Sequence, residues 1–85
     1  MNDPISEIIN CVHRLGGSIA SSYDVVETSP GQTEYAYIVD VNKRLPDNTH
    51  IHKRFFHVNM MVAYEEAMKM LVRAIEEFNI HHPGY

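Results

Sequence analysis

The stretch from Asn59 to Asn79 constrains the fold most, because it predicts a helix of about five turns with an unusually wide apolar surface. A first set of side chains at helical spacing forms a core stripe: Ala63, Ala67, Met70, Leu71, Ala74 and Phe78. A second apolar set lies beside it: Met61, Tyr64, Met68, Val72 and Ile75. Together they span roughly 200° of the helix, about twice the ~100° that a core-facing helix needs. A small domain must either cover these additional apolar side chains with its own residues or use them to bind a partner.

The N-terminal segment predicts a second, shorter helix. Asp3 suits the N-cap, and Pro4 suits the first helical position, where a missing N–H costs nothing. One apolar face follows at helical spacing, made of Ile5, Ile8, Ile9 and Val12. Gly16 and Gly17 then end the helix, because glycine accepts the left-handed backbone that a helix terminus needs.

The middle of the chain predicts three strands, at residues 19–26, 33–41 and 49–58. The second is the clearest, because aromatic and β-branched residues dominate it. A turn at 29–32 and a loop at 42–48 separate the strands, and such short links favour an antiparallel meander. The sequence therefore predicts an α+β fold in the order α-β-β-β-α, with two helices packed on one face of a three-stranded antiparallel sheet.

Length and composition fit one domain. The chain has 85 residues, of which 45% are hydrophobic and 21% charged, which is a globular balance. We expect a single domain over residues 1–80 and a tail over 81–85, where the His-His-Pro-Gly-Tyr sequence cannot continue a helix. The net charge of −4 argues against tight, sequence-blind phosphate binding. No apolar run or signal pattern indicates a membrane or export, so we expect a soluble intracellular protein, cytoplasmic or nuclear.

These landmarks resemble the double-stranded RNA-binding domain from Asp3 to about Phe78. Four segments carry the resemblance: Asp3–Ser6, Ser22–Glu27, Pro30-Gly31 and Thr33–Val41. They are similar, in order, to the start of that family's first helix, its first strand, the loop after it and its second strand. The resemblance implies the same α-β-β-β-α frame, with Ala63 and Ala67 as small core residues of the closing helix.

The residues by which that family grips RNA are absent. Members that bind RNA carry lysines at the start of the last helix, where this chain has Met60, Met61 and Tyr64. They also carry a histidine in the loop after the first strand, where this chain has Ser29–Gln32. The resemblance therefore implies a degenerate member that serves as a protein-binding or dimerising module, in or on nucleic-acid-processing machinery.

We interpret the surplus apolar residues of the last helix as a protein-binding surface. Its candidate residues are Met60, Met61, Tyr64, Met68, Val72 and Ile75. Methionine suits adaptable interfaces because it is unbranched and polarizable, and a monomer rarely exposes so large an apolar patch. The partner would be another protein or a second copy of the chain. The alternative is that a tilted first helix covers all of these residues.

Two other functions stay open. Four of the seven basic residues would lie at one end of the sheet if the second and third strands pair: Lys43, Arg44, Lys53 and Arg54. They could neutralise about four phosphates of double-stranded RNA, which predicts weak and salt-sensitive binding. The alternative for this group is a solvated sheet end. A small acidic chain also suits an inhibitor of a nucleic-acid defence complex, of the kind that phages make.

Catalysis has little support, because the chain has no Gly-rich phosphate loop, no nucleophile elbow and no paired carboxylates at a site-like position. We expect a protein that is not an enzyme and needs no cofactor. His50 and His52 share a strand face but lack a convincing third ligand, so no metal site is expected. Cys11 is the single cysteine, which excludes an internal disulfide. Tyr35 and Tyr37 share one strand face with Val39. This face is an aromatic platform if it is open and core if the helices cover it, and the alternation favours core.

Overall fold

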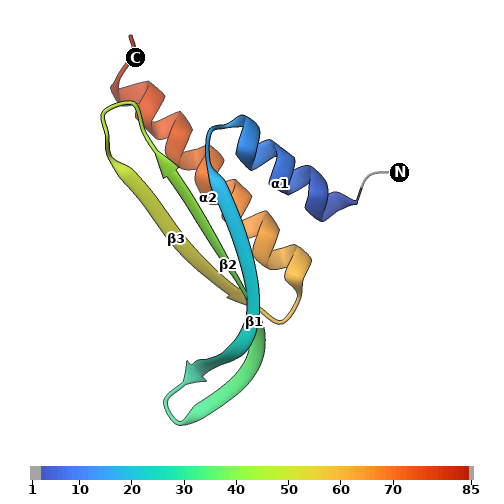
Figure 1. Cartoon of the computed structure of the whole chain (residues 1–85). Coiled ribbons are helices and arrows are strands. Elements are labelled where there is room, and N and C mark those ends of the chain that lie inside the picture. The colour runs from blue at the N-terminus through green and yellow to red at the C-terminus, as the bar shows by residue number, and fades with distance from the viewer. Residues whose placement is uncertain (1–2, 85) are drawn as a thin grey trace.

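The computed structural model describes residues 3–84, so Met1, Asn2 and Tyr85 of the predicted domain and tail lie outside the described residues. Within this range two helices and three strands follow one another in the predicted order (Figure 1). The elements are α1 (Pro4–Arg14), β1 (Ser18–Ser29), β2 (Gln32–Arg44), β3 (His50–His57) and α2 (Met60–His81). The strands form one antiparallel sheet, which confirms the predicted α+β class.

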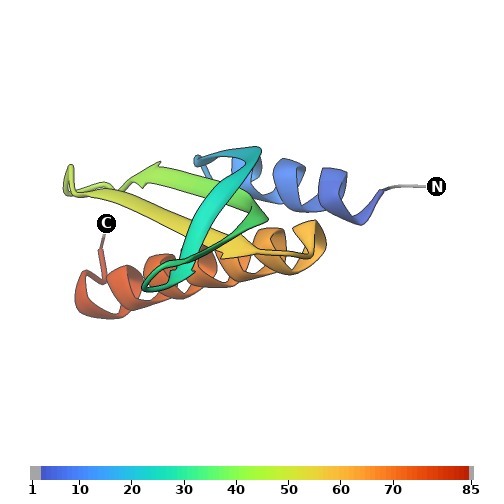
Figure 2. The ribbon, with the colours of Figure 1, turned by 90° about the horizontal axis from the view of Figure 1, so that it is seen from below.

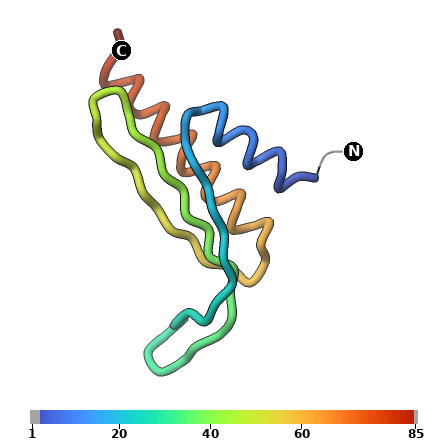
Figure 3. The backbone as a smooth tube through the Cα atoms, in the orientation of Figure 1, coloured from blue at the N-terminus to red at the C-terminus, as the bar shows by residue number. Residues whose placement is uncertain are grey.

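The sheet has the order β1-β2-β3, and its strands differ in how far they pair. β3 accompanies β2 only from Tyr37, opposite His57, to Arg44, opposite His50. Beyond this point β1 and β2 continue as a two-stranded extension, which we call the arm and define as residues 24–36. The arm projects past the helices and the rest of the sheet (Figures 1 and 3).

β2 extends three residues further than predicted, because 42–44 belong to the strand and not to the loop. These residues pair with the start of β3, and that ladder outweighs the weak strand propensity of their sequence. The loop that remains is short, and Asn48 adopts a positive φ of 76° there.

Both helices begin as predicted. The Asp3 carboxylate accepts a hydrogen bond from the Ile5 amide at 3.3 Å, and Pro4 is the first helical residue. Asn59 caps α2 by accepting from the Met61 amide at 2.9 Å. The end of α2 differs from the prediction, because the helix includes His81, which we had placed in the tail.

The core lies between the helices and one face of the sheet. Val39 and Val41 of β2 are fully buried there, together with Val12 of α1 and Leu71 of α2. Figure 2 shows α2 as a layer along this face, and α1 packs against α2 and β1. The predicted stripe of α2 is confirmed at its centre, since Ala63, Ala67, Leu71 and Phe78 are all buried, while Met70 and Ala74 are partly exposed.

The prediction that Tyr35 is a core residue is wrong. Tyr35 lies on the arm, beyond the end of β3 and both helices, and is 60% exposed. It stacks on Tyr23 at 5.5 Å between ring centroids, and Tyr23 also meets Tyr37 at 4.7 Å. Tyr37 stands at the base of the arm and is half-buried. Strand alternation identified the shared face correctly, but the helices are too short to cover it along its whole length.

Candidate protein interface and the basic end of the sheet

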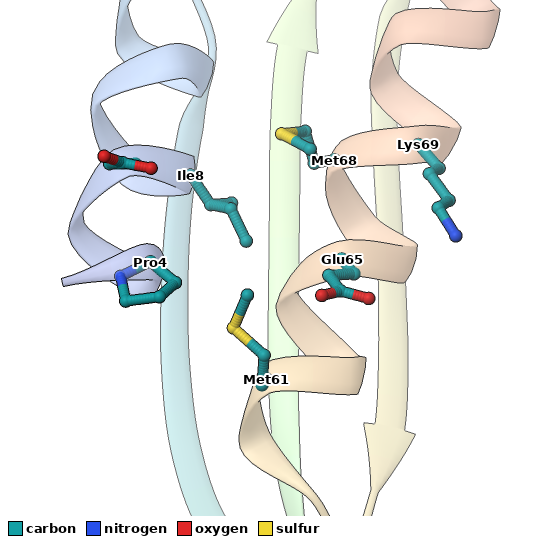
Figure 4. Close-up of a pocket in the computed structure, with 7 residues that line it drawn as sticks. Pro4, Ile8, Met61, Glu65, Met68 and Lys69 are labelled. Carbon is teal, nitrogen blue, oxygen red and sulfur yellow. The ribbon is translucent and has the colours of Figure 1, made fainter. Parts of the chain in front are cut away.

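An apolar hollow of about 330 Å³ lies between α1 and α2 (Figure 4). Its lining residues come from both helices: Pro4, Glu7 and Ile8 from α1, and Met61, Glu65, Met68 and Lys69 from α2. Ile8, Met61 and Met68 point into the space between the helices and form its apolar floor (Figure 4). Met61 and Met68 lie seven residues apart, which places them on the same face of α2 two turns apart.

A second hollow of about 380 Å³ continues along α2, lined by Met68, Lys69, Val72, Arg73 and Glu76. The two hollows share Met68 and Lys69, so together they make one surface that we call the helix groove. Met61, Met68 and Val72 stay partly exposed, although Met61 and Met68 pack against the core. The helix groove is therefore apolar surface that the fold of the single chain leaves open.

Charged side chains flank the helix groove. Glu7, Glu65 and Lys69 line the hollow between the helices together with its apolar residues. Lys69 points away from α1 in Figure 4, and Arg73 follows it one turn later on α2. Glu76 joins Lys69 and Arg73 around the second hollow, so both hollows of the groove combine apolar side chains with charges of both signs.

The structure separates the six predicted interface residues into three groups. Met61, Met68 and Val72 line the helix groove. Met60 and Ile75 are partly exposed and pack against the core, but they line neither of its two hollows. Tyr64 was predicted wrongly, because it is only 5% exposed and belongs to the core.

Tyr64 is buried because it faces the sheet. Its hydroxyl donates a hydrogen bond to Ser21 Oγ of β1 at 2.8 Å, which satisfies the buried phenol. The sequence contained a usable signal, since Tyr64 precedes Leu71 by seven residues and therefore shares its helix face. The width of the apolar arc alone could not say which of its residues would meet β1.

The four predicted RNA-contacting residues do not form one patch. Lys53 stands opposite Val41 in the ladder, so Lys43 and Lys53 lie on the face that bears the helices. Arg44 and Arg54 lie on the opposite, open face for the same reason. The prediction that strands two and three pair is confirmed, but the two-residue period of a strand places neighbouring cations on opposite faces.

Arg54 is already paired with a carboxylate. Its Nε donates to Asp40 Oδ1 at 2.8 Å, and His52 approaches the same oxygen at 3.4 Å. The hydrogen bond from Arg54 lowers the pKa of Asp40 below its ordinary value, against a smaller opposing effect of burial. The positive charge of Arg54 is therefore largely offset before any ligand arrives.

His50 and His52 share the open face of β3, as predicted. Among residues 3–84, no three histidine, cysteine or carboxylate side chains are grouped so that they could hold a metal ion. In the same part of the chain, neither helix combines the length and the apolar character that crossing a membrane requires.

Comparison of the chain with protein-family models, with curated proteins and with solved structures finds no match. The fold and the two surfaces therefore define a class only: a small α+β domain with an apolar groove between its helices and a polar end to its sheet. Kinship with double-stranded RNA-binding domains stays a prediction from the sequence.

Proposed function

We propose that this chain is a non-catalytic protein-interaction module that binds its partner in the helix groove. One observation carries the proposal: Met61, Met68 and Val72 line a continuous hollow between and along the helices although the core is complete beneath them. A partner that covers such exposed apolar surface removes it from water, which favours binding. Methionine side chains also adapt to partners of different shape.

The partner segment that fits best is an amphipathic helix with a basic residue beside its apolar anchors. A groove between two helices accepts a third helix whose apolar side chains are three or four residues apart. Glu7 and Glu65 border the floor of the groove, so a lysine or arginine on the incoming helix would find carboxylates there. A role in or on nucleic-acid-processing machinery rests on the sequence resemblance alone.

The two alternative functions have weaker support. Direct binding of double-stranded RNA needs several cations on one surface, whereas here Lys43 and Lys53 lie on one face and Arg44 and Arg54 on the other. Inhibition of a nucleic-acid defence complex by mimicry of phosphate charge draws only on the net charge of −4.

Selection of helical peptides from a displayed random library tests the proposal. We expect the selected peptides to carry apolar anchors at helical spacing and a basic residue. Met68→Glu should weaken their binding more than tenfold, because it places a carboxylate in the apolar floor. Ile80→Glu is the matched control, since Ile80 is on the same helix, 73% exposed and outside the groove.

Equal binding by the Met68→Glu variant and the native chain would show that the groove is not the docking site. Sedimentation equilibrium of the native chain and the same variant tests the second-copy alternative. A dimer that Met68→Glu disperses and Ile80→Glu preserves would make a second copy the occupant in place of a partner helix.

A further inference from the structure

A second, polar hollow lies at the end of the sheet remote from the arm. It has a volume of about 240 Å³ and is lined by Gly16, Gly17, Ser18, Asn42, Lys43, Arg44 and His50. β1 begins at Ser18, opposite Asn42, so β2 continues for two residues without a β1 partner. The hollow therefore forms where the turn after α1 enters the sheet, and we call it the cationic hollow after two of its lining residues, Lys43 and Arg44.

The ammonium group of Lys43 is placed by a glycine. Gly16 has a φ of +81°, and Lys43 Nζ lies only 3.1 Å from the position that a Cβ on residue 16 would occupy. A side chain at residue 16 would therefore push the ammonium away. The absence of one lets Nζ lie close over the backbone of the turn, at the edge of the hollow.

Arg44 and His50 face each other on the adjoining strands. They are direct partners in the β2–β3 ladder, so their side chains share the open face. Arg44 Nη1 donates to Asn48 Oδ1 at 3.0 Å, which leaves its other N–H groups for a further acceptor. Lys43 lies on the other face of β2, but the edge of β2 beyond Asn42 has no β1 neighbour, so Lys43, Arg44 and His50 all line the same hollow at this edge.

Among residues 3–84, no carboxylate lines the hollow. Both ion pairs in this range involve Asp40, one with Arg54 and one with His52. The negative end of α1 is also largely satisfied, because the amides of Leu15, Gly16 and Gly17 donate back to carbonyls of its last turn. The contrast with Arg54 is direct: one cation has its carboxylate, and the cations of the hollow have none.

We propose that the cationic hollow binds a phosphate group through Lys43, Arg44 and His50. The planar guanidinium suits two phosphate oxygens, the ammonium supplies a point charge, and the imidazole N–H adds a third donor. The volume lies below the 300–1,000 Å³ typical of pockets for drug-sized ligands, which fits a single phosphate group. This inference does not depend on the proposed docking of a partner helix.

Titration with inorganic phosphate, followed by the ¹⁵N–¹H spectra of the intact chain at pH 6.5, tests the inference. We expect the amides of Gly16, Gly17 and Ser18 to shift and saturate at millimolar phosphate, while chloride at the same ionic strength leaves them unchanged. Lys43→Gln and Arg44→Gln should each weaken binding about fivefold or more, because each removes a charge-assisted hydrogen bond.

Lys53→Gln and Arg54→Gln are the matched controls, because both remove a cation of β3 that does not line the hollow. Unchanged binding in these two variants, with loss in the other two, supports a defined site. Equal weakening in all four variants would show general charge attraction and overturn the proposal. So would the absence of saturable shifts with phosphate, provided that melting curves show each variant folded.

The source of the phosphate is resolved by two further probes. One is a nucleoside 5′-monophosphate, and the other is a short RNA duplex with either a 5′-phosphate or a 5′-hydroxyl end. Tighter binding of the phosphorylated duplex than of the hydroxyl duplex would assign a nucleic-acid end as the source. Equal affinity for inorganic phosphate and the nucleotide would assign a free phosphate group. If both duplexes bind equally and more tightly than phosphate, the hollow is not a site for a single phosphate group.

Discussion

The helix groove and the cationic hollow differ in size and in chemistry, because the two hollows of the groove measure about 330 and 380 Å³ and the cationic hollow about 240 Å³. The groove lies between α1 and α2 and continues along α2, where Met61, Met68 and Val72 are partly exposed beside a core that is already complete. The hollow arises from three separate segments that meet where β1 begins. The groove offers apolar area, which favours a large partner, and the hollow offers unpaired charge, which favours a small anion.

The largest effect is expected at Leu71, a core residue of the helix that carries the groove. Leu71 is fully buried, and its Cδ2 lies 3.3 Å from the position that a Cβ on Gly17 would occupy. Leu71→Ala should lower the free energy of unfolding by about 2–5 kcal/mol, because it leaves a cavity in the core. Urea denaturation measures this loss. Met68→Ala is the comparison, and a loss as large as that of Leu71→Ala would mean that Met68 is core and not groove.

Gly17 supports the cationic hollow without contributing to the helix groove. A Cβ at this position would stand 2.9 Å from the Asn42 carbonyl oxygen and 3.2 Å from Val12. Gly17→Ala should therefore cost about 1–3 kcal/mol of stability and weaken phosphate binding, because the backbone of the turn must move. Binding of helical peptides in the groove should not change.

Gly31→Ala is the control for this experiment, since Gly31 also has a positive φ, of +77°, but no atom lies within 4 Å of its added Cβ. We expect it to cost about 1 kcal/mol through backbone strain alone and to leave phosphate binding unchanged. Equal costs at both glycines in thermal melts would show that the close packing at Gly17 relaxes without penalty.

Tyr64 tests the boundary between groove and core. Tyr64→Phe removes the hydroxyl that bonds Ser21, which should cost about 0.5–1.5 kcal/mol of stability in urea denaturation. Peptide binding should stay the same, because Tyr64 does not line the groove. Tyr35→Phe on the exposed arm is the control and should leave stability unchanged. Weaker peptide binding by Tyr64→Phe would mean that Tyr64 belongs to the docking surface after all.

The two openings also differ in how far the sequence predicts them. Helix periodicity and the caps at Asp3 and Asn59 located both helices, and periodicity identified Met61, Met68 and Val72 as surplus apolar surface. These signals depend only on residues close together in the chain, so they can be recognised in the sequence without knowledge of the fold.

The residues that were missed depend on contacts between distant segments. The pairing of Asp40 with Arg54 requires the register of β2 on β3, and the position of Lys43 over Gly16 requires the entry angle of β1. Neither follows from local patterns, because a shift of one residue in register moves each side chain to the other face. Gly16 and Gly17 were correctly predicted to end a helix, but their second contribution, space beside Lys43, appears only in the fold.

The smallest effect is expected at Asp40, whose carboxylate pairs with Arg54 and not with Lys43 or Arg44 of the cationic hollow. Because the hydrogen bond from Arg54 lowers the pKa of Asp40 in the folded state, the stabilising contribution is present above the ordinary carboxyl pKa of about 3.9 and is lost as the pH falls through the lowered value. Asp40→Asn should therefore reduce the fall in melting temperature between about pH 5 and pH 2, by only a small amount since the pair is close to solvent.

Asp40→Asn also leaves Arg54 without the carboxylate that pairs with it. If charge alone made an anion site, Asp40→Asn would create a second phosphate site beside Arg54. If the site also needs the turn at Gly16, phosphate should still shift only the amides around the cationic hollow.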